Sequence, residues 1–533
     1  MRLAVPVLLL AATAMQFEMN PQTLLFNDNY GRTRFFHGVN AVVKVPPYLP
    51  ITDHWDAQMS ISVEDIANLT AWGFNFVRLG VMWQATETIQ GEYNYTYLDQ
   101  VNDLITTLGE AGLYTLVDAH QDVFARVLCG EGAPDFFAQD LDHTCDYNPT
   151  SKYWEETGYC TPIAHYNWTY EDGLPIIPDC LKNVFAVYYN TPEAASAFER
   201  LYYNESGIQD HFIGHWEAVA KTLGPNPYVI GYDLLNEPLP ANVWKDPLLN
   251  IPGIFDRLGL QPMYQNLNAA IRQYSDDKII MFEPVEADLY NGTAFHSGFN
   301  ETPGGVKYNN RQVLNDHTYC CQMYWWVCPT GEPGLQWAEQ CYAFHESRIG
   351  TRKQDAEMLG LGLILTEFGA CSDSIECVTE LTSVTEVCDN NLVSWAYWAY
   401  KGFQDYTTSG GGAIEGFYDA DGNLQPNKLK ALSRTYIYAY QGTPISHFFN
   451  STTGVYTATF NLDPTISMPT ELYYNSELYY PNSYVLNFSP AIPSIQSAQV
   501  IQLAPNYLAI AFPQVHVVTT VTLTFAPIQP TIA

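Results

Sequence analysis

The chain has 533 residues, of which 47% are hydrophobic and 14% aromatic, enough for one large domain with an extensive core and a smaller second domain. Its 23 Lys and Arg residues against 57 Asp and Glu residues give a net charge of −34, which would repel nucleic acids and anionic membranes and excludes both as electrostatic partners. No stretch after the first residues is long and apolar enough to cross a bilayer, so we expect no stable membrane insertion.

The N-terminal segment MRLAVPVLLLAATA is typical of a secretory signal peptide. Arg2 precedes a short apolar run that ends in small residues, which predicts cleavage after Ala14 and a secreted protein, extracellular or in a digestive, lysosome-like compartment. Eight N-x-[ST] patterns agree with a glycosylated surface, although Pro after the last residue of the patterns at 300 and 487 disfavours those two: Asn68, Asn94, Asn167, Asn204, Asn291, Asn300, Asn450 and Asn487.

Eight apolar, β-rich runs recur between residues 35 and 400, with helix-compatible segments between them. They are FFHGVNAV (35–42), FVRLGVMW (76–83), YTLVDAH (114–120), YVIGYDLLNEP (228–238), KIIMFEPVE (278–286), QVLNDHTY (312–319), LGLILTEFG (361–369) and LVSWAYWAY (392–400). Strands that alternate with helices pair in parallel, and eight such units predict a closed (β/α)8 TIM barrel. Two helices are readable directly, one after the N-cap residue Ser62 and one at 98–112, which ends in glycine.

The segment between the third and fourth runs is much longer than one crossover helix needs, and it carries four cysteines. We expect this cysteine-rich insertion, around residues 125–200, to form a wall or lid over the C-terminal face of the barrel. The eleven cysteines lie in three clusters, at 129–180, 320–341 and 371–388, which predicts disulfides and, because the number is odd, at least one free thiol. No spacing of Cys and His suggests zinc, so we expect no metal and no other cofactor.

From about residue 435 the pattern changes to short runs such as GVYTATFNL and VHVVTTVTLTF, which alternate with Pro, Asn and Ser and lack helical periodicity. This pattern predicts a small antiparallel β-sandwich. The expected fold is therefore α/β, with a signal peptide at 1–14, a catalytic (β/α)8 barrel at 22–434 and a C-terminal β-sandwich at 435–533, rigidly apposed to the barrel in a monomer.

Polar and aromatic side chains gather at or just beyond the C-terminal ends of the predicted strands: Arg78, His120, Asp122, Asn236, Glu237, His317, Tyr319, Glu367 and Trp398. Because these ends share one face of a barrel, residues far apart in the sequence converge on one pocket. Two carboxylates, such as Glu237 and Glu367, are what glycosidic bond hydrolysis requires, since one protonates the leaving oxygen and the other attacks the sugar. Arg78 beside Glu367 would lower the pKa of that carboxyl.

Each of these residues also has a simpler explanation. Glu237 could merely end a strand, and Arg78 could be a buried ion-pair partner. The two histidines and Asp122 could be satisfied polar groups of the core or loops, and Trp398 could be a core residue rather than an apolar floor for a sugar ring. The coincidence of so many such residues at one barrel face favours the catalytic interpretation.

Several motifs resemble those of the retaining (β/α)8 glycosidases that include the family 5 cellulases. LLNEP and LTEFGA are common to that clan. HGVNAVVKVPPYLP, LVDAHQDVFAR and GEGAPDFF are similar, more specifically, to endoglycoceramidases, which split the bond between the glycan and the ceramide of glycosphingolipids. The resemblance covers the whole barrel and, more loosely, the C-terminal sandwich.

The resemblance implies a role for each residue at the strand ends. Glu237 would be the acid/base and Glu367 the nucleophile, while Asn236 would bind the sugar 2-hydroxyl. Tyr319 and Arg78 would orient Glu367. The remaining matches would contact the glycan, with His120, His317 and Trp398 around the reacting sugar and Lys44 and Asp122 at glycan hydroxyls.

A lipid leaving group needs an apolar trough beside the acid/base, and the segments 45–50 and 324–327 could supply one or could pack as ordinary loops. The sequence thus predicts a secreted, retaining endo-β-glycosidase acting on glycosphingolipids, with its two carboxyl groups about 5–5.5 Å apart. A family 5 β-glucanase or cellulase-type hydrolase on soluble glycans, and a non-catalytic glycolipid-binding protein, are the alternatives.

Overall fold

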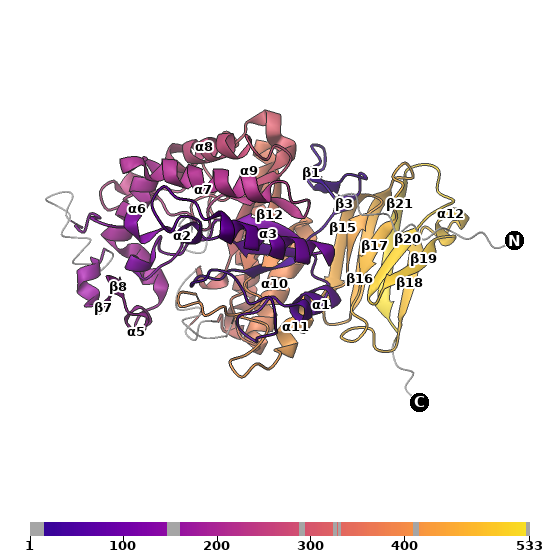
Figure 1. Ribbon diagram of the computed structural model, residues 1–533. Helices are drawn as coiled ribbons and strands as arrows, with labels where there is room; N and C mark the ends of the chain where they lie inside the picture. Colours follow the sequence, from indigo (N-terminus) through magenta and orange to yellow (C-terminus); the bar gives the residue numbers. More distant parts are fainter. Residues whose placement is uncertain are drawn as a thin grey trace.

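The computed structural model describes residues 15–145, 160–286, 294–322, 328, 332–408 and 415–528. The predicted signal peptide, the acceptor pattern at Asn291 and the segment 324–327 lie outside these residues. Figure 1 shows a barrel surrounded by helices on the left and in the centre, with a β-sandwich on the right. Within the described ranges, no helix combines the length and the apolar character that a membrane span requires.

Eight parallel strands close into the predicted barrel and follow one another around it in sequence order. They are β4 (His37–Ala41), β5 (Phe76–Gly80), β6 (Tyr114–Asp118), β9 (Val229–Asp233), β10 (Ile279–Phe282), β11 (Gln312–Thr318), β12 (Gly362–Phe368) and β13 (Ser394–Tyr397). Each strand lies inside one of the eight predicted runs. The runs are continuously apolar because a parallel barrel strand is covered on both faces, by the interior and by helices.

Helices cover the outside of the barrel: α1 (Val63–Ala71), α2 (Trp83–Thr86), α3 (Tyr95–Glu110), α6 (Pro192–Tyr202), α7 (Ile208–Leu223), α8 (Gln261–Ile271), α9 (Ala338–Leu359), α10 (Ile375–Asn391) and α11 (Pro426–Leu432). The predicted cap of α1 is confirmed, since the Ser62 hydroxyl and the Asp65 carboxylate accept each other's backbone N–H. The second predicted helix begins before residue 98, because Asn94 accepts the Tyr97 N–H and caps the helix at Tyr95.

Disulfides fasten the insertion and the loops at the top of the barrel. The five bonds are Cys129–Cys180, Cys145–Cys160, Cys320–Cys341, Cys321–Cys328 and Cys371–Cys377. Cys388 is the free, buried thiol that the odd number of cysteines predicts. The insertion also contains the short hairpin of β7 (Tyr170–Glu171) and β8 (Leu174–Pro175) and the one-turn helix α5 (Ile177–Cys180).

Two antiparallel sheets form the sandwich, as predicted. The four-stranded sheet has the order β15 (Gly442–Asn450), β16 (Val455–Leu462), β21 (Thr519–Pro527) and β18 (Tyr484–Ser489). The seven-stranded sheet has the order β1 (Phe17–Met19), β2 (Phe26–Asp28), β3 (Thr33–Arg34), β14 (Tyr436–Tyr440), β17 (Thr470–Tyr473), β20 (Tyr507–Ala511) and β19 (Gln499–Ala504). The short helix α12 (Pro493–Gln496) joins β18 to β19.

The N-terminal strands β1 to β3 belong to the sandwich sheet, so the predicted start of the barrel at residue 22 does not match the division between the sheets. Strands of two or three residues leave no apolar run that the sequence could reveal. Phe17, Met19 and Phe26 of these strands also join the core that fills the bottom of the barrel, together with Phe36 and Phe76. The N-terminal segment therefore links both domains.

Tyrosine hydroxyls join the sandwich to the C-terminal end of α1, where the last carbonyls of a helix lack an intrahelical partner. The three bonds are Tyr436 to the Gly73 carbonyl (2.8 Å), Tyr473 to the Ala71 carbonyl (2.9 Å) and Tyr507 to the Thr70 carbonyl (2.6 Å). Gly73 has a φ of +90°, and a Cβ there would come within 2.2 Å of the Tyr473 ring, so glycine is required for both reasons.

Candidate active site

The side chains at the C-terminal ends of the barrel strands form one connected network. It contains all ten residues singled out from the sequence: Lys44 beyond β4, Arg78 on β5, His120 and Asp122 beyond β6, Asn236 and Glu237 beyond β9, His317 on β11 and Tyr319 beyond it, Glu367 on β12 and Trp398 beyond β13. The shared face of a parallel barrel explains why residues so distant in the sequence meet here.

Glu367 is buried and receives a hydrogen bond on each carboxylate oxygen. Arg78 Nη1 binds Oε1, and the Tyr319 hydroxyl donates to Oε2 over 3.0 Å. Burial raises the pKa of the Glu367 carboxyl above its usual value, while the positive charges of His317 and Arg78 oppose that shift. The predicted lowering of this pKa by Arg78 is therefore outweighed by burial.

Glu237 lies opposite Glu367, and its side chain remains 17% exposed. Its Oε1 is 2.9 Å from Nδ1 of His317, and that nitrogen is also 3.6 Å from Glu367 Oε2. One oxygen of Glu237 and one of Glu367 lie within 4.8 Å of each other. That spacing fits the separation of about 5–5.5 Å in retaining glycosidases and leaves too little room for the interposed water of inverting ones.

The two carboxyl groups differ in their surroundings. Arg78 and Tyr319 donate to both oxygens of Glu367 and stabilise its charged form. Glu237, the predicted acid/base, is the more exposed of the two.

Arg78 is fully buried and distributes its guanidinium over several acceptors. Besides Glu367, it binds Asp118 (3.0 Å), Asp233 (2.8 Å) and the Asn236 side-chain oxygen (2.8 Å). The pKa of Asp233 is raised to about 8 by burial, with Arg78 opposing the shift and neighbouring carboxylates adding to it. Arg78 thus holds Glu367, the predicted nucleophile, and Asn236, the predicted ligand of the sugar 2-hydroxyl.

His120 and Trp398 form a flat surface within the site. Their rings stack with centroids 5.1 Å apart and an interplanar angle of 17°. His120 Nδ1 is 2.8 Å from Asp118 Oδ2; burial lowers the pKa of this imidazole, but the Asp118 carboxylate outweighs burial and raises it to about 9. The Trp398 indole N–H donates to Glu415 over 2.7 Å, which holds the ring in place.

Lys44 is buried beside this aromatic surface, with Nζ 4.8 Å from the centroid of the Trp398 ring. Three carboxylates surround the ammonium: Asp122 at 2.6 Å, Asp405 at 2.8 Å and Glu131 at 3.1 Å. Its three hydrogens are therefore occupied by the protein. The predicted contacts of Lys44 and Asp122 with glycan hydroxyls stay predictions, and they require the substrate to exchange with some of these bonds.

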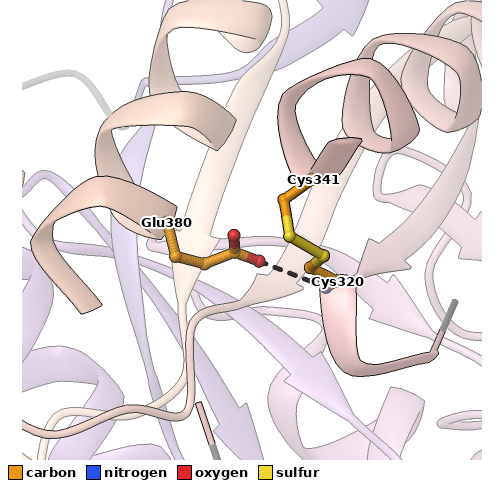
Figure 2. A group of neighbouring side chains, drawn as sticks. All are labelled: Cys320, Cys341 and Glu380. Carbon is orange, nitrogen blue, oxygen red and sulfur yellow. Dashed lines mark hydrogen bonds between the residues drawn. A yellow bond between two sulfur atoms is a disulfide. The ribbon is translucent and has the colours of Figure 1, made fainter. Parts of the chain in front are cut away.

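Among the described residues, two groups have donor atoms close enough to share a metal ion. Figure 2 shows the first, in which Cys320 and Cys341 are joined by a disulfide, so neither sulfur is available as a thiolate ligand. The second consists of Glu237, His317 and Glu367. These side chains already form the hydrogen bonds described above, and the expectation that no metal is needed stays a prediction.

Comparisons with known proteins agree with this geometry. The family model described as Cellulase (glycosyl hydrolase family 5) matches residues 47–404, and that of the glycoside hydrolase family 5 C-terminal domain matches residues 434–517. A protein named Endoglycoceramidase from Hydra vulgaris is 34% identical over 89% of this chain and 83% of its own length. Another of that name, from Cyanea nozakii, is 31% identical over 90% of this chain and 88% of its own length.

The chain belongs to the endoglycoceramidases of glycoside hydrolase family 5. The fold agrees with a solved structure of endo-glycoceramidase II from Rhodococcus sp., described as a ganglioside GM3 complex. That structure superposes with a TM-score of 0.69 at 21% identity and covers 94% of this chain and 99% of the Rhodococcus chain. The resemblance inferred from the motifs and the predicted fold are thereby confirmed.

A mainly apolar pocket of about 410 Å3 is lined in part by residues that closely follow Glu237 in the chain. Its lining includes Tyr189, Leu239, Pro240, Ala241, Val243 and Trp244. Leu239 follows Glu237 by two residues, and the Tyr189 hydroxyl donates to Asp122 over 3.3 Å. The segment 45–50, for which a trough and ordinary loop packing were the alternatives, does not line this pocket, and Val45 and Tyr48 pack against the main core.

Sequence reasoning missed several residues of the site. Asp118 and Asp233 stand inside apolar strands, where a carboxylate signals a buried partner, here Arg78. Glu283 directly follows β10 at the position where other strands carry a functional group, and that position was the available signal. Gln121 lies between His120 and Asp122 and has no distinguishing feature in the sequence.

Proposed function

We propose that this enzyme is a secreted, retaining endo-β-glycosidase that hydrolyses the bond between the oligosaccharide and the ceramide of glycosphingolipids. The observation that carries the proposal is a closely spaced pair of carboxylates, followed in the chain after Glu237 by residues that line an apolar pocket. The names of the two relatives and the ganglioside in the Rhodococcus structure support the same substrate class. Five disulfides and the predicted signal peptide support secretion.

In the first step, a carboxylate oxygen of Glu367 attacks the anomeric carbon of the sugar linked to ceramide. The bond from that carbon to the ceramide oxygen breaks, and the proton of Glu237 passes to this oxygen. The products are free ceramide and a glycosyl ester of Glu367. Asn236, held by Arg78, lies where it can bind the 2-hydroxyl, a contact that strengthens as positive charge develops on the sugar.

In the second step, water attacks the anomeric carbon of the ester from the side that ceramide has left. The Glu237 carboxylate accepts a proton from this water, and the bond to Glu367 breaks. The oligosaccharide leaves with its original β configuration, because two inversions have occurred at the same carbon. Tyr319 and Arg78 stabilise the returning charge on Glu367 through the hydrogen bonds to its two oxygens.

The two halves of the substrate have different environments. The apolar pocket beyond Glu237 suits the hydrocarbon of ceramide, while the polar surface around Asp122 and Trp398 suits the glycan. With a net charge of −34, the protein has no electrostatic means of binding an anionic membrane, so it would take single lipids from micelles or vesicles as a monomer.

The direct test incubates the purified enzyme with lactosylceramide or a ganglioside and, separately, with a soluble β-glucan. Release of ceramide together with an intact oligosaccharide, first detected by NMR as the β anomer, is the expected result. Cleavage of the glucan alone would identify a β-glucanase, and binding of glycolipid without products would identify a binding protein. Initial release of the α anomer would contradict the retaining mechanism.

The substitution Glu367→Gln removes the nucleophile and should abolish ceramide release. The amide occupies the same volume and can still accept from Tyr319, so the midpoint of thermal unfolding should change little. Activity and unfolding are measured on the same preparation. Retained turnover would rule out Glu367 as the nucleophile.

The substitution Val243→Asp places a charge in the pocket proposed for ceramide. We expect KM for glycosphingolipid to rise about tenfold or more, as burial of an unpaired charge against hydrocarbon is unfavourable, with little change for a soluble aryl lactoside. Val306→Asp is the matched control, because Val306 is 85% exposed and lies outside the pocket. Equal effects on the lipid and the soluble substrate would show that the pocket does not hold ceramide.

A further inference from the structure

The backbone of Glu237 has an unusual conformation. Its φ is +40°, in the left-handed region that is sterically unfavourable for residues with a Cβ. This conformation turns the chain away from β9, so that the carboxylate points toward His317 and the adjacent residue, Pro238, accepts from the Glu286 N–H over 3.1 Å. Contacts from the surrounding structure must maintain such a backbone, since the residue itself disfavours it.

Glu283 supplies one of these contacts from the neighbouring strand end. This carboxylate is 1% exposed, and its Oε2 accepts the backbone N–H of Glu237 over 3.0 Å. Its Oε1 is 3.3 Å from Nε2 of His317, whose other ring nitrogen binds the Glu237 carboxylate. Burial lowers the pKa of His317, but Glu283 and Glu367 outweigh it and raise that pKa well above its usual value, so both ring nitrogens carry hydrogen.

Gln121 supplies the second contact, from the loop after β6. Its side-chain amide donates to the carbonyl oxygens of Asn236 (2.8 Å) and Glu237 (3.1 Å). The Asn236 side chain in turn donates to the Gln121 carbonyl over 3.0 Å. The backbone of Glu237 is therefore held at its N–H by one buried side chain and at its carbonyl by another.

We propose that Glu283 and Gln121 form a clamp that positions the acid/base Glu237. Glu283 acts on both parts of that residue, directly on the backbone N–H and through His317 on the carboxylate. Neither clamp residue touches the reacting atoms, so both are positioning residues. The inference rests on the proposed function only for the role of Glu237 as the proton donor.

Substrates with different leaving groups distinguish residues that position the acid/base from residues that only maintain the fold. A 2,4-dinitrophenyl β-lactoside loses its leaving group without protonation, whereas an octyl β-lactoside has the same glycan but requires the proton. For both substrates, kcat/KM reports only the steps up to release of the leaving group. We expect Glu283→Ala to lower kcat/KM for the octyl lactoside by about 10²-fold, the lower end of what general acid catalysis contributes, and for the dinitrophenyl lactoside by less than about fivefold.

Two further variants extend the test. Glu283→Gln keeps an oxygen that can accept the Glu237 N–H, so it should recover most of the activity that Glu283→Ala loses on the octyl lactoside. Gln121→Ala removes an uncharged side chain and should show the same selective loss, which keeps the test valid if Glu283→Ala fails to fold.

Glu380 provides a matched control. It is buried and, like Glu283, accepts a backbone N–H, from Cys320 over 3.1 Å, and lies 2.8 Å from a histidine nitrogen, Nε2 of His345. Figure 2 shows its carboxylate, carried by α10, directed at Cys320 of the Cys320–Cys341 disulfide. Glu380→Ala should change both lactosides by the same factor.

Equal losses on the two lactosides in Glu283→Ala and Gln121→Ala, as in the control, would overturn the clamp. The proposed substrate is tested separately, since wild-type enzyme that hydrolyses both lactosides but releases no ceramide from glycosphingolipid contradicts that substrate and leaves the clamp measurement intact. A wild-type enzyme that hydrolyses only the dinitrophenyl lactoside would show that Glu237 is no general acid, and both proposals would be wrong.

Discussion

Arg78 is one cation surrounded by several carboxyl groups. Its guanidinium binds Asp118, Asp233 and Glu367, and Glu283 lies 3.5 Å away. The imidazolium groups of two histidines provide the remaining positive charge, because the pKa values of both are raised by carboxylates despite burial. The protonation of histidine is therefore part of the stability of the site as well as of its chemistry.

Protonation of His120 should make the stability of the enzyme depend on pH. Its pKa is about 9 in the folded chain and about 6.5 when unfolded, so the stabilisation is complete below about pH 6.5 and is lost as the pH rises through about 9. We expect the Tm of the wild type to fall more steeply between these values than the Tm of His120→Asn. Comparing the two proteins removes the effect of other titrating groups. Parallel Tm curves would contradict a stabilising effect of protonated His120.

The barrel strands, and most of the site residues at their ends, could be predicted from the sequence. Each barrel strand lies within an apolar run, and nine of the ten predicted site residues follow from their place at or just beyond the end of such a run, whereas Lys44 follows from the family resemblance. Glu283 also stands at the end of such a run. Its proposed function depends on the backbone conformation of Glu237, and no sequence pattern reveals that conformation. The short strands β1 to β3 and the pairing of the cysteines depend on contacts between distant segments, which a single sequence does not contain.

The disulfide Cys129–Cys180 fastens the insertion to the loop that carries Asp122, across a sequence separation of 51 residues. Replacing both cysteines by serine should lower the free energy of unfolding by about 2–4 kcal/mol, since a long loop regains its freedom in the unfolded chain. Denaturant unfolding provides the measurement. The pair Cys371 and Cys377, with a sequence separation of only 6, is the control. Replacing this pair should lower the free energy of unfolding by less than replacing Cys129 and Cys180, and a larger loss would contradict the loop-length argument.

The two domains of the molecule share structural elements. The N-terminal strands pair with the sandwich, while Phe17 and Phe26 fill the bottom of the barrel. Figure 1 shows these strands, in indigo, beside the sandwich. Three tyrosines of the sandwich also complete the hydrogen bonds at the end of α1. An interface that supplies both core and hydrogen bonds should make the domains unfold together.

Calorimetry should accordingly show a single unfolding transition for the wild type. The triple substitution of Tyr436, Tyr473 and Tyr507 by Phe removes three interdomain hydrogen bonds and should destabilise the protein by about 0.5–1.5 kcal/mol for each bond. Tyr274→Phe, at a side chain that is 45% exposed, is the control and should leave the transition unchanged. Two separate transitions in the wild type would contradict the shared interface.

Helix α1 has a second attachment at its other end. Asp65, in its first turn, accepts hydrogen bonds from the Tyr400 hydroxyl (2.7 Å) and from Lys401 Nζ (2.5 Å), which follow Trp398 closely in the chain. The helix therefore connects the sandwich to the segment that carries Trp398, the predicted floor of the sugar site. A chain shortened to end after α11 would lose the anchor of that connection, so the sandwich, which contributes none of the ten site residues, is expected to be indispensable for catalysis.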